Sequence, residues 1–94
     1  MIITDEAKEA FKTLFHQYES ENIRVYFAGQ GEGSPEIGLS FDVPEDNDVI
    51  QTINGIKVAI DPQILFVAEE LTLDLQDTPE GRGIVITGGP DQIM

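Results

Sequence analysis

The pair Asn54-Gly55 constrains the fold of this chain more than any other two residues. A type I′ turn needs a positive φ at both central positions, and asparagine followed by glycine meets that need at low steric cost. Apolar segments at residues 49–53 and 56–60 lie on either side of the pair. We therefore predict a β-hairpin in which these two segments are strands joined by a two-residue turn.

The N-terminal segment has the spacing of an amphipathic helix. Thr4 supplies an N-cap oxygen, and Asp5 and Glu6 follow it in the first turn, where the helix dipole favours acidic side chains. Apolar side chains then recur at helical spacing. These are Ala7, Ala10, Phe11, Leu14, Phe15 and Tyr18. We predict a helix from about Asp5 to Glu19 that lies on a core through its aromatic face.

After Asn22 the hydrophobic period changes to two, which is typical of strands. Besides the hairpin we predict strands at residues 24–28, 37–43, 71–75 and 84–87, and a loop at residues 78–83. Asp61-Pro62 places an N-cap acid before a proline at the first helical position, which predicts a short helix over residues 63–67. These elements make one α+β domain over residues 1–94, with mostly antiparallel sheets packed against one N-terminal helix and a short helix.

The charge of the chain disfavours some classes of partner. Eighteen acidic and five basic side chains give 94 residues a formal net charge of −13. Nucleic acids and anionic membranes are bound through lysine and arginine contacts with phosphate, so we expect neither as a partner. The acidity serves solubility, or it forms a surface for a basic protein or a cation. Nothing resembles a signal peptide or the roughly 18 apolar residues of a membrane span, so we expect a soluble cytoplasmic protein.

A glycine-rich loop is the best candidate for a site. Residues 29–35 read Gly-Gln-Gly-Glu-Gly-Ser-Pro, which holds the carboxylate of Glu32 between glycines. Glycine is normally kept where φ must be positive or where another group approaches the backbone closely. The loop leads into a strand and has no lysine, so it is neither a dinucleotide-binding fingerprint nor a P-loop. Cysteine is absent from the sequence, which excludes disulfides and thiolate ligands within these 94 residues.

Other candidate residues have simpler interpretations. His16 is the only imidazole, and its neighbours one helical turn away are polar, so we interpret it as a surface side chain rather than a metal ligand. The acidic run at residues 45–48 lacks the glycine and the closing glutamate of an EF-hand, which indicates a turn. No serine has a histidine and an acid spaced for nucleophilic catalysis, and we predict that the chain is not an enzyme.

Six motifs stand in an order that is shared with a known family. They are "MIITDEA" at the leading helix, "IRVYF" before the glycine loop, "GLSFD" after it, "NGIKVAIDPQIL" across the hairpin and short helix, "LTLDL", and "GRGIVIT". From Met1 to about Pro90 the chain resembles the HesB-like family of A-type, IscA-like iron–sulfur cluster carriers. The resemblance implies the HesB-like α+β fold. It also implies a homo-oligomer, because proteins of this family tend to form dimers or tetramers.

The resemblance shows equally where this chain departs from the family. The carriers hold iron or a cluster through one cysteine in the glycine loop and a Cys-Gly-Cys near the C-terminus. The loop position falls on Glu32, and the C-terminal pair falls beyond Pro90, where the sequence reads Asp-Gln-Ile-Met. Clusters need soft thiolate ligands, whereas a carboxylate prefers harder ions. We therefore expect a binding or accessory protein, without a cofactor, whose partner is a protein of the iron–sulfur assembly pathway.

A metal site built from oxygen ligands is the alternative. Glu32 with Glu36, or several copies of Glu32 in an oligomer, would offer carboxylates to iron or another divalent cation. A single monodentate carboxylate holds a cation weakly. The simpler interpretation of Glu32 is a solvated loop residue on an acidic protein.

Overall fold

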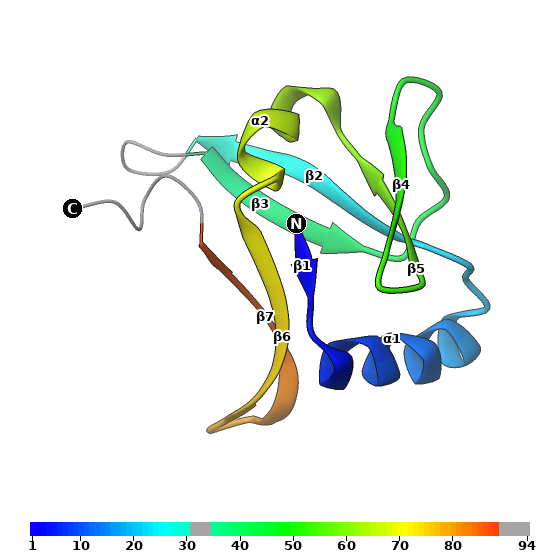
Figure 1. The fold of residues 1–94 in the computed structure, drawn as a ribbon, viewed down its shortest axis with the longest axis vertical. Helices are drawn as coiled ribbons and strands as arrows, with labels where there is room; N and C mark the ends of the chain where they lie inside the picture. The colour runs from blue at the N-terminus through cyan, green and yellow to red at the C-terminus, as the bar shows by residue number, and fades with distance from the viewer. Residues whose placement is uncertain (31–34, 89–94) are drawn as a thin grey trace.

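The computed structural model describes residues 1–30 and 35–88. In chain order the elements are β1 (Ile2–Ile3), α1 (Asp5–Tyr18), β2 (Ile23–Gln30), β3 (Pro35–Ser40), β4 (Val49–Ile53), β5 (Ile56–Ile60), the 3-10 helix η1 (Pro62–Ile64), α2 (Leu65–Ala68), β6 (Leu71–Thr78) and β7 (Gly81–Gly88). Figure 1 shows α1 toward the lower end of the molecule and α2 at the upper end, with most of the strands between them and the tip of the β6–β7 hairpin reaching below α1. The predicted α+β class is confirmed.

The strands form two sheets in the described part of the chain. One has the order β1-β6-β7 and the other has the order β3-β2-β5-β4. Pairing is antiparallel between β2 and β3, between β4 and β5, and between β6 and β7. It is parallel between β1 and β6 and between β2 and β5. The sheets are therefore mixed, with mostly antiparallel pairs as predicted.

The helix α1 begins and ends for local reasons. The backbone N–H of Ala7 donates to the Thr4 hydroxyl oxygen at 3.2 Å, so Thr4 is the predicted N-cap. Glu19 ends the helix with a left-handed φ of 51°, and its N–H donates to the carbonyl oxygen of Phe15. Ala7 and Phe11 form the buried face of α1. Within the described residues, no helix has the length and apolar character needed to cross a membrane.

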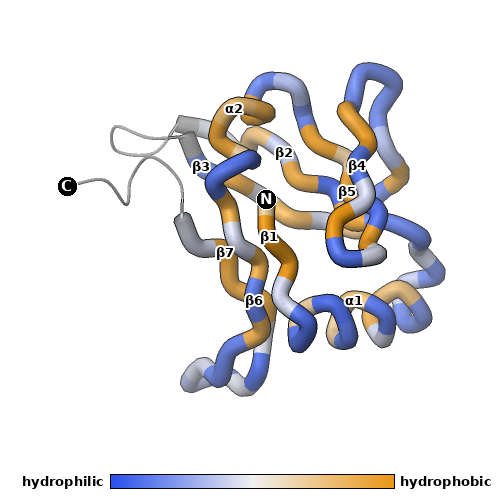
Figure 2. Tube along the Cα trace, in the orientation of Figure 1, coloured by the Kyte–Doolittle hydropathy of each residue, from blue (hydrophilic) through white to orange (hydrophobic). Residues whose placement is uncertain are grey.

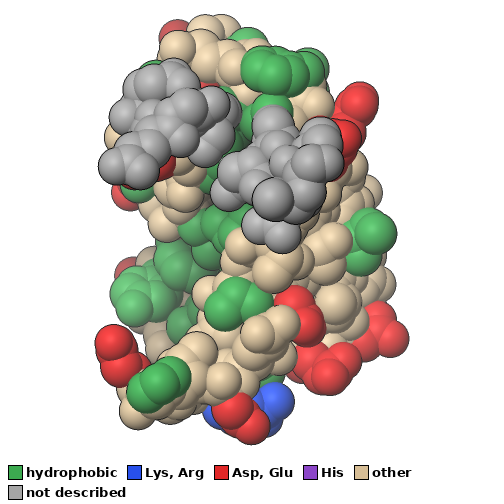
Figure 3. All heavy atoms as spheres, turned by 90° about the vertical axis from the view of Figure 1, so that its left-hand side faces the viewer, with side chains coloured by type: hydrophobic (Ala, Val, Ile, Leu, Met, Phe, Trp, Pro, Cys, Tyr) green, Lys and Arg blue, Asp and Glu red, His purple; other side chains and the backbone are tan. Residues whose placement is uncertain are grey.

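The buried apolar side chains form a core between α1, α2 and the two sheets. Its members are Ile3, Ala7, Phe11, Ile23, Val25, Ile56, Val58, Ile60, Ile64, Val67, Ala68, Leu71 and Leu73. Figure 2 shows hydrophobic stretches in β1, β5 and α2, and hydrophilic stretches in the segment before β4. Half-buried apolar side chains of β3 and β7, among them Ile37, Leu39, Ile84 and Ile86, pack against this core. Hydrophobic side chains also reach the surface on the face that Figure 3 shows.

The Asn54-Gly55 turn has the predicted geometry. Asn54 has a φ of 50° and Gly55 a φ of 80°, and β4 pairs with β5 along its whole length. The Asn54 side-chain amide also donates to the carbonyl oxygen of Ile3 at 2.9 Å and to the carboxylate of Asp5 at 3.0 Å. The turn therefore both closes the hairpin and fastens it to the start of α1.

A Gly55→Ala variant tests this turn. In the left-handed region Cβ approaches a carbonyl oxygen, so we expect the free energy of unfolding, measured with urea, to fall by about 1 kcal/mol. Crowding adds little, because a Cβ at Gly55 meets only the end of the Lys8 side chain, at 3.6 Å. Gly83→Ala is the matched control, since Gly83 has no left-handed φ and its Cβ would enter open space. An equal loss in both variants would contradict this account.

Two segments depart from the predicted boundaries. The predicted loop at residues 78–83 is mostly strand, since β6 continues to Thr78 and β7 starts at Gly81. The hydroxyl of Thr78 donates a hydrogen bond to the carbonyl oxygen of Gly81 and accepts one from Glu80 N at 3.2 Å. These two bonds close the turn. The strand predicted over residues 37–43 ends earlier, at Ser40.

The early end of β3 has a visible cause. The hydroxyl of Ser20 donates to the carbonyl oxygen of Phe41 at 2.9 Å, and the side-chain amide of Asn22 donates to that of Asp42 at 3.0 Å. These bonds take the place of strand pairing. The Phe41 ring stacks on that of Tyr18, with ring centroids 5.0 Å apart. The segment after β3 is thereby held against the end of α1.

Candidate functional site

Two strands carry the chain into and out of the glycine loop. β2 and β3 pair antiparallel, and the last described positions include Gly29 opposite Glu36. The register shifts between Phe27 and Gly29, which leaves Ala28 as an extra residue in β2, and Gly29 has a positive φ of 135°. Residues 31–34 lie outside the described residues. The proposed ligand role of Glu32 falls there and stays a prediction.

The carboxylate of Asp61 supports the base of this hairpin. The backbone N–H of Gln63 donates to one carboxylate oxygen at 3.0 Å, so Asp61 caps η1 as predicted. The N–H of Phe27 donates to the other oxygen at 3.3 Å, and Asp61 N donates to the carbonyl oxygen of Val25 at 3.0 Å. Asp61 is only 9% exposed. One buried side chain thus joins η1 to β2 immediately before the bulge, a contact that the sequence did not indicate.

An Asp61→Ala variant tests this support. Two backbone N–H groups lose their acceptor, so we expect a loss of about 2 kcal/mol in the free energy of unfolding. Hydrogen exchange at the Phe27 amide should become faster. Asp42→Ala is the control, because Asp42 is exposed. A variant as stable as the parent, with unchanged exchange at Phe27, would show that the carboxylate does not support β2.

The structure places the other predicted candidates at the surface. Glu36 is exposed on β3, and His16 is exposed on α1 as predicted. Within residues 1–30 and 35–88, no group of three or more histidine, aspartate or glutamate side chains is placed to hold a metal ion. The described residues therefore bring no ready-made set of ligands to Glu36.

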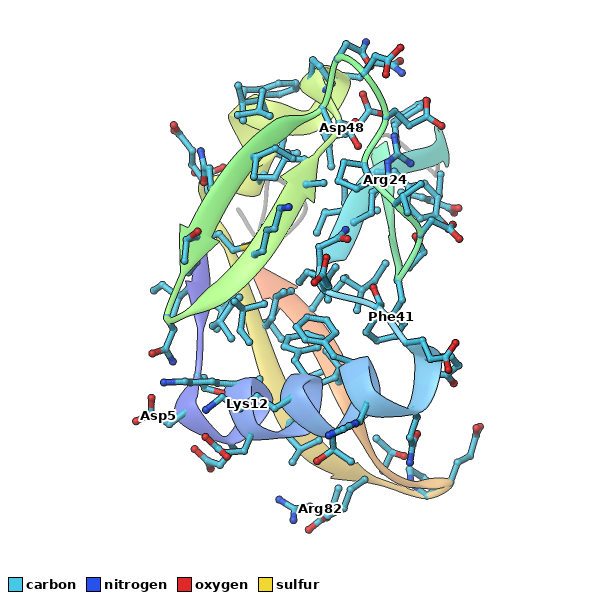
Figure 4. The ribbon with its side chains drawn as sticks, turned by 90° about the vertical axis from the view of Figure 1, so that its right-hand side faces the viewer. Asp5, Lys12, Arg24, Phe41, Asp48 and Arg82 are labelled. Carbon is cyan, nitrogen blue, oxygen red and sulfur yellow. The ribbon has the colours of Figure 1, made fainter. Side chains whose placement is uncertain are left out.

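The acidic turn before β4 contains a buried carboxylate that the sequence did not single out. The Asp48 side chain is fully buried and accepts from Arg24 Nε at 2.7 Å and from Arg24 Nη2 at 3.2 Å. It also accepts from Glu45 N at 2.8 Å. Figure 4 shows Arg24 and Asp48 pointing toward each other at the upper end of the molecule. Arg24 in addition lies over the Tyr26 ring, 5.5 Å from its centroid.

These contacts set the charge state of the pair. The hydrogen bond from Arg24 lowers the pKa of Asp48, and burial acts against this by raising it. The hydrogen bond from the Glu45 N–H and the positive charge of Arg24 lower the pKa further. The same hydrogen bond raises the pKa of Arg24. Both groups are therefore charged at neutral pH, and the pair holds the acidic turn against β2.

Comparisons with known proteins identify relatives of this chain. No protein-family model matches the chain. It is 30% identical over 89 residues to the iron-sulfur cluster insertion protein ErpA of Histophilus somni, a match that covers 92% of this chain and 79% of ErpA. It is 34% identical over 80 residues to the Fe/S biogenesis protein NfuA of Shewanella amazonensis, which covers 80% of this chain and 42% of NfuA.

Solved structures share the architecture. The crystal structure of IscA with its 2Fe-2S cluster matches with a TM-score of 0.76 at 16% identity, over 93% of this chain and 83% of IscA. A solution NMR structure of a protein from Aquifex aeolicus matches with a TM-score of 0.58 at 27% identity, over 92% of this chain and 88% of that one. The match to IscA concerns the fold, whereas the match to ErpA covers most of both sequences. By that match, this chain belongs to the HesB-like, IscA-like family.

Proposed function

We propose that this chain is a single, non-enzymatic HesB-like domain of iron–sulfur cluster biogenesis that acts in the cytoplasm through contacts with proteins of that pathway. Its relatives ErpA and NfuA are a cluster insertion protein and a biogenesis protein by name. One observation carries the proposal: the chain has the fold of IscA and not a single cysteine among its 94 residues.

The side chains of this sequence do not fit a cluster held by thiolates. Iron–sulfur clusters are bound by cysteine sulfur, in some cases with histidine in place of part of the set. The chain has no cysteine and one histidine, His16, which is exposed on α1. Carboxylates are the abundant alternative, and they suit harder cations than the iron of a sulfide cluster. What the domain keeps is a folded surface on which another protein can dock.

The charge of that surface favours a basic partner. With a formal charge of −13, the protein attracts positively charged surfaces at long range and repels acidic ones. Such complementarity raises association rates and excludes wrong partners more than it raises affinity. Binding should therefore weaken with added salt, because salt screens exposed charges.

Mixing the protein with its cysteine-bearing relatives tests the proposal. Purified ErpA of Histophilus somni and NfuA of Shewanella amazonensis would be loaded with cluster and mixed anaerobically with this chain. Sedimentation velocity should show a complex with at least one of them. The visible absorbance of the cluster should stay with the cysteine-bearing protein after separation. No complex with either relative, or transfer of the cluster to this chain, would contradict the proposal.

The oxygen-ligand site remains the second candidate, favoured by the position of Glu36. Its exposed carboxylate lies at the start of β3, opposite Gly29 with its positive φ, where the glycine loop ends. Glu32 and copies of both residues in a homo-oligomer would complete the ligand set. Ferrous iron titration of the parent beside Glu32→Ala and Glu36→Ala tests it. Stoichiometric uptake lost in both variants supports the site, and equal uptake in all three proteins excludes it.

A further inference from the structure

A groove lies between α1 and the β6–β7 hairpin. Its volume is about 490 Å³, and it is lined by Asp5, Glu6, Glu9, Ala10, Thr13, Leu75 and Arg82. The five helix residues recur at helical spacing, so they form one stripe along α1. Figure 4 shows Arg82 beneath α1, on the side where the β6–β7 hairpin passes the helix. Neither the glycine loop nor the Arg24–Asp48 pair takes part in this groove.

The groove follows from the length of the hairpin. β6 and β7 have eight residues each, and the core ends part of the way along them. Leu73 is fully buried, whereas Leu75, two residues further and on the same face, is only half-buried. Arg82 pairs with Asp77 across the hairpin, which places it on that face as well. The hairpin thus extends beyond the core and leaves an apolar floor, made by Ala10 and Leu75, open to solvent.

The rim of the groove on the helix side is acidic. Asp5, Glu6 and Glu9 are exposed there, and within the described residues Asp5 and Glu6 form no ion pair. Glu9 has Lys12 at 3.5 Å, with both side chains more than half exposed. On the hairpin side the positive charge of Arg82 is offset by Asp77 at 3.3 Å. The groove therefore combines an apolar floor with net negative charge.

We propose that this groove docks a protein segment that carries an apolar anchor flanked by lysine or arginine side chains. The anchor would cover Ala10 and Leu75, and the cations would lie beside Glu6 and Glu9. An apolar centre with a charged rim is the usual anatomy of a protein interface. The carboxylates attract a basic segment and reject an acidic one. The claim that an iron–sulfur partner uses this groove rests on the proposed function. The claim that the groove prefers a basic segment with an apolar anchor does not.

The probe is a synthetic peptide of alternating leucine and lysine with blocked ends, beside a second peptide in which glutamate replaces every lysine. Amide chemical shifts of the labelled protein report where the peptide binds. We expect the leucine–lysine peptide to shift the amides of Ala10, Thr13 and Leu75 most strongly. The glutamate peptide should not bind. Shifts spread evenly over the acidic surface would overturn the proposal, because they would show attraction without a site.

Two variants separate docking from general attraction. Ala10→Glu adds a negative charge but fills the floor, so docking predicts weaker peptide binding and attraction alone predicts tighter binding. Glu6→Gln with Glu9→Gln leaves the floor open and should weaken binding about fivefold, as expected for two exposed ion pairs. Glu69→Gln with Glu70→Gln is the matched control, because both residues are exposed at the other end of the molecule, after α2. An equal loss of peptide binding in the control would overturn the proposal. If Ala10→Glu does not fold, the variant with Glu6→Gln and Glu9→Gln takes its place as the test.

The same variants distinguish this proposal from the proposed function. If ErpA binds and Ala10→Glu weakens it, the groove is the surface of that contact. If ErpA binds equally to parent and variant, the proposed function stands and the groove is refuted as its contact surface. If the peptide binds in the groove but neither relative binds, the groove stands and the proposed function fails.

Discussion

Replacing Phe11 with alanine should lower the free energy of unfolding by about 4 kcal/mol, the largest single effect that we expect in this domain. The Phe11 side chain is fully buried and stacks on Phe15, with ring centroids 6.3 Å apart. It lies on the face of α1 that meets both sheets, so its removal opens a cavity that the surrounding strands cannot easily close. Domains of this size have total stabilities of about 5–15 kcal/mol, so the variant should be near its limit of folding.

Urea denaturation measures this effect. With a denaturant slope of about 1–3 kcal/mol per molar, the midpoint should fall by roughly 1.3 M or more. Phe66→Ala is the matched control, because the same atoms are removed from a side chain that is 70% exposed. Its midpoint should stay close to that of the parent. Equal midpoints for both variants would show that Phe11 does not have the central place in the core that we assign to it.

Replacing Asp48 with asparagine should cost about 2–3 kcal/mol at neutral pH. The change keeps the shape of a fully buried side chain but removes the charge that Arg24 faces at 2.7 Å. Arg24, only 15% exposed, then keeps its positive charge without a counter-charge at this position. Asp46→Asn is the control, because Asp46 is an exposed acid of the same turn. A loss no larger than that of the control would contradict a structural role for the pair.

The cost of Asp48→Asn should depend on pH with a definite sign. Because Arg24 lowers the pKa of Asp48 in the folded state, the unfolded chain takes up the proton first as pH falls. The stabilisation is complete above the ordinary aspartate pKa of about 3.9 and is lost as pH falls from there toward the lowered native pKa. The stability difference between parent and variant should therefore be constant near neutrality and shrink below about pH 4. A difference that stays constant throughout this range would contradict the assigned pKa shift.

The elements that sequence predicted well are those with local causes. The hydroxyl of Thr4, the Asn54-Gly55 turn and the Asp61 cap each act within a few residues, and each lies where the pattern placed it. Of the aromatic stripe of α1, Phe11 is buried and Phe15 packs against the core, whereas Tyr18, which was also predicted to face the core, is 61% exposed. The order of local motifs likewise predicted membership of the HesB-like family, and the match to ErpA confirms it.

The features that sequence reasoning missed depend on contacts between separate segments of the chain. β1 has only two residues, too few for a period, and forms because β6 lies beside it. The strand content of residues 78–83 comes from pairing between β6 and β7, despite glycines that usually indicate a loop. Arg24 and Asp48 are 24 residues apart, and nothing in either segment indicates which of the acids in the turn is buried. The groove beside α1 also depends on how far the hairpin extends past the core.

The most direct test of the central claim is cluster reconstitution. The untagged protein would be incubated anaerobically with ferrous iron and sulfide, desalted, and assayed for iron, labile sulfide and visible absorbance. ErpA of Histophilus somni, treated in the same way, is the reference. We predict that ErpA acquires cluster absorbance while this chain, which has no cysteine, retains no labile sulfide. Stoichiometric iron and sulfide on this chain, with the absorbance of a cluster, would contradict the claim that it acts without holding one.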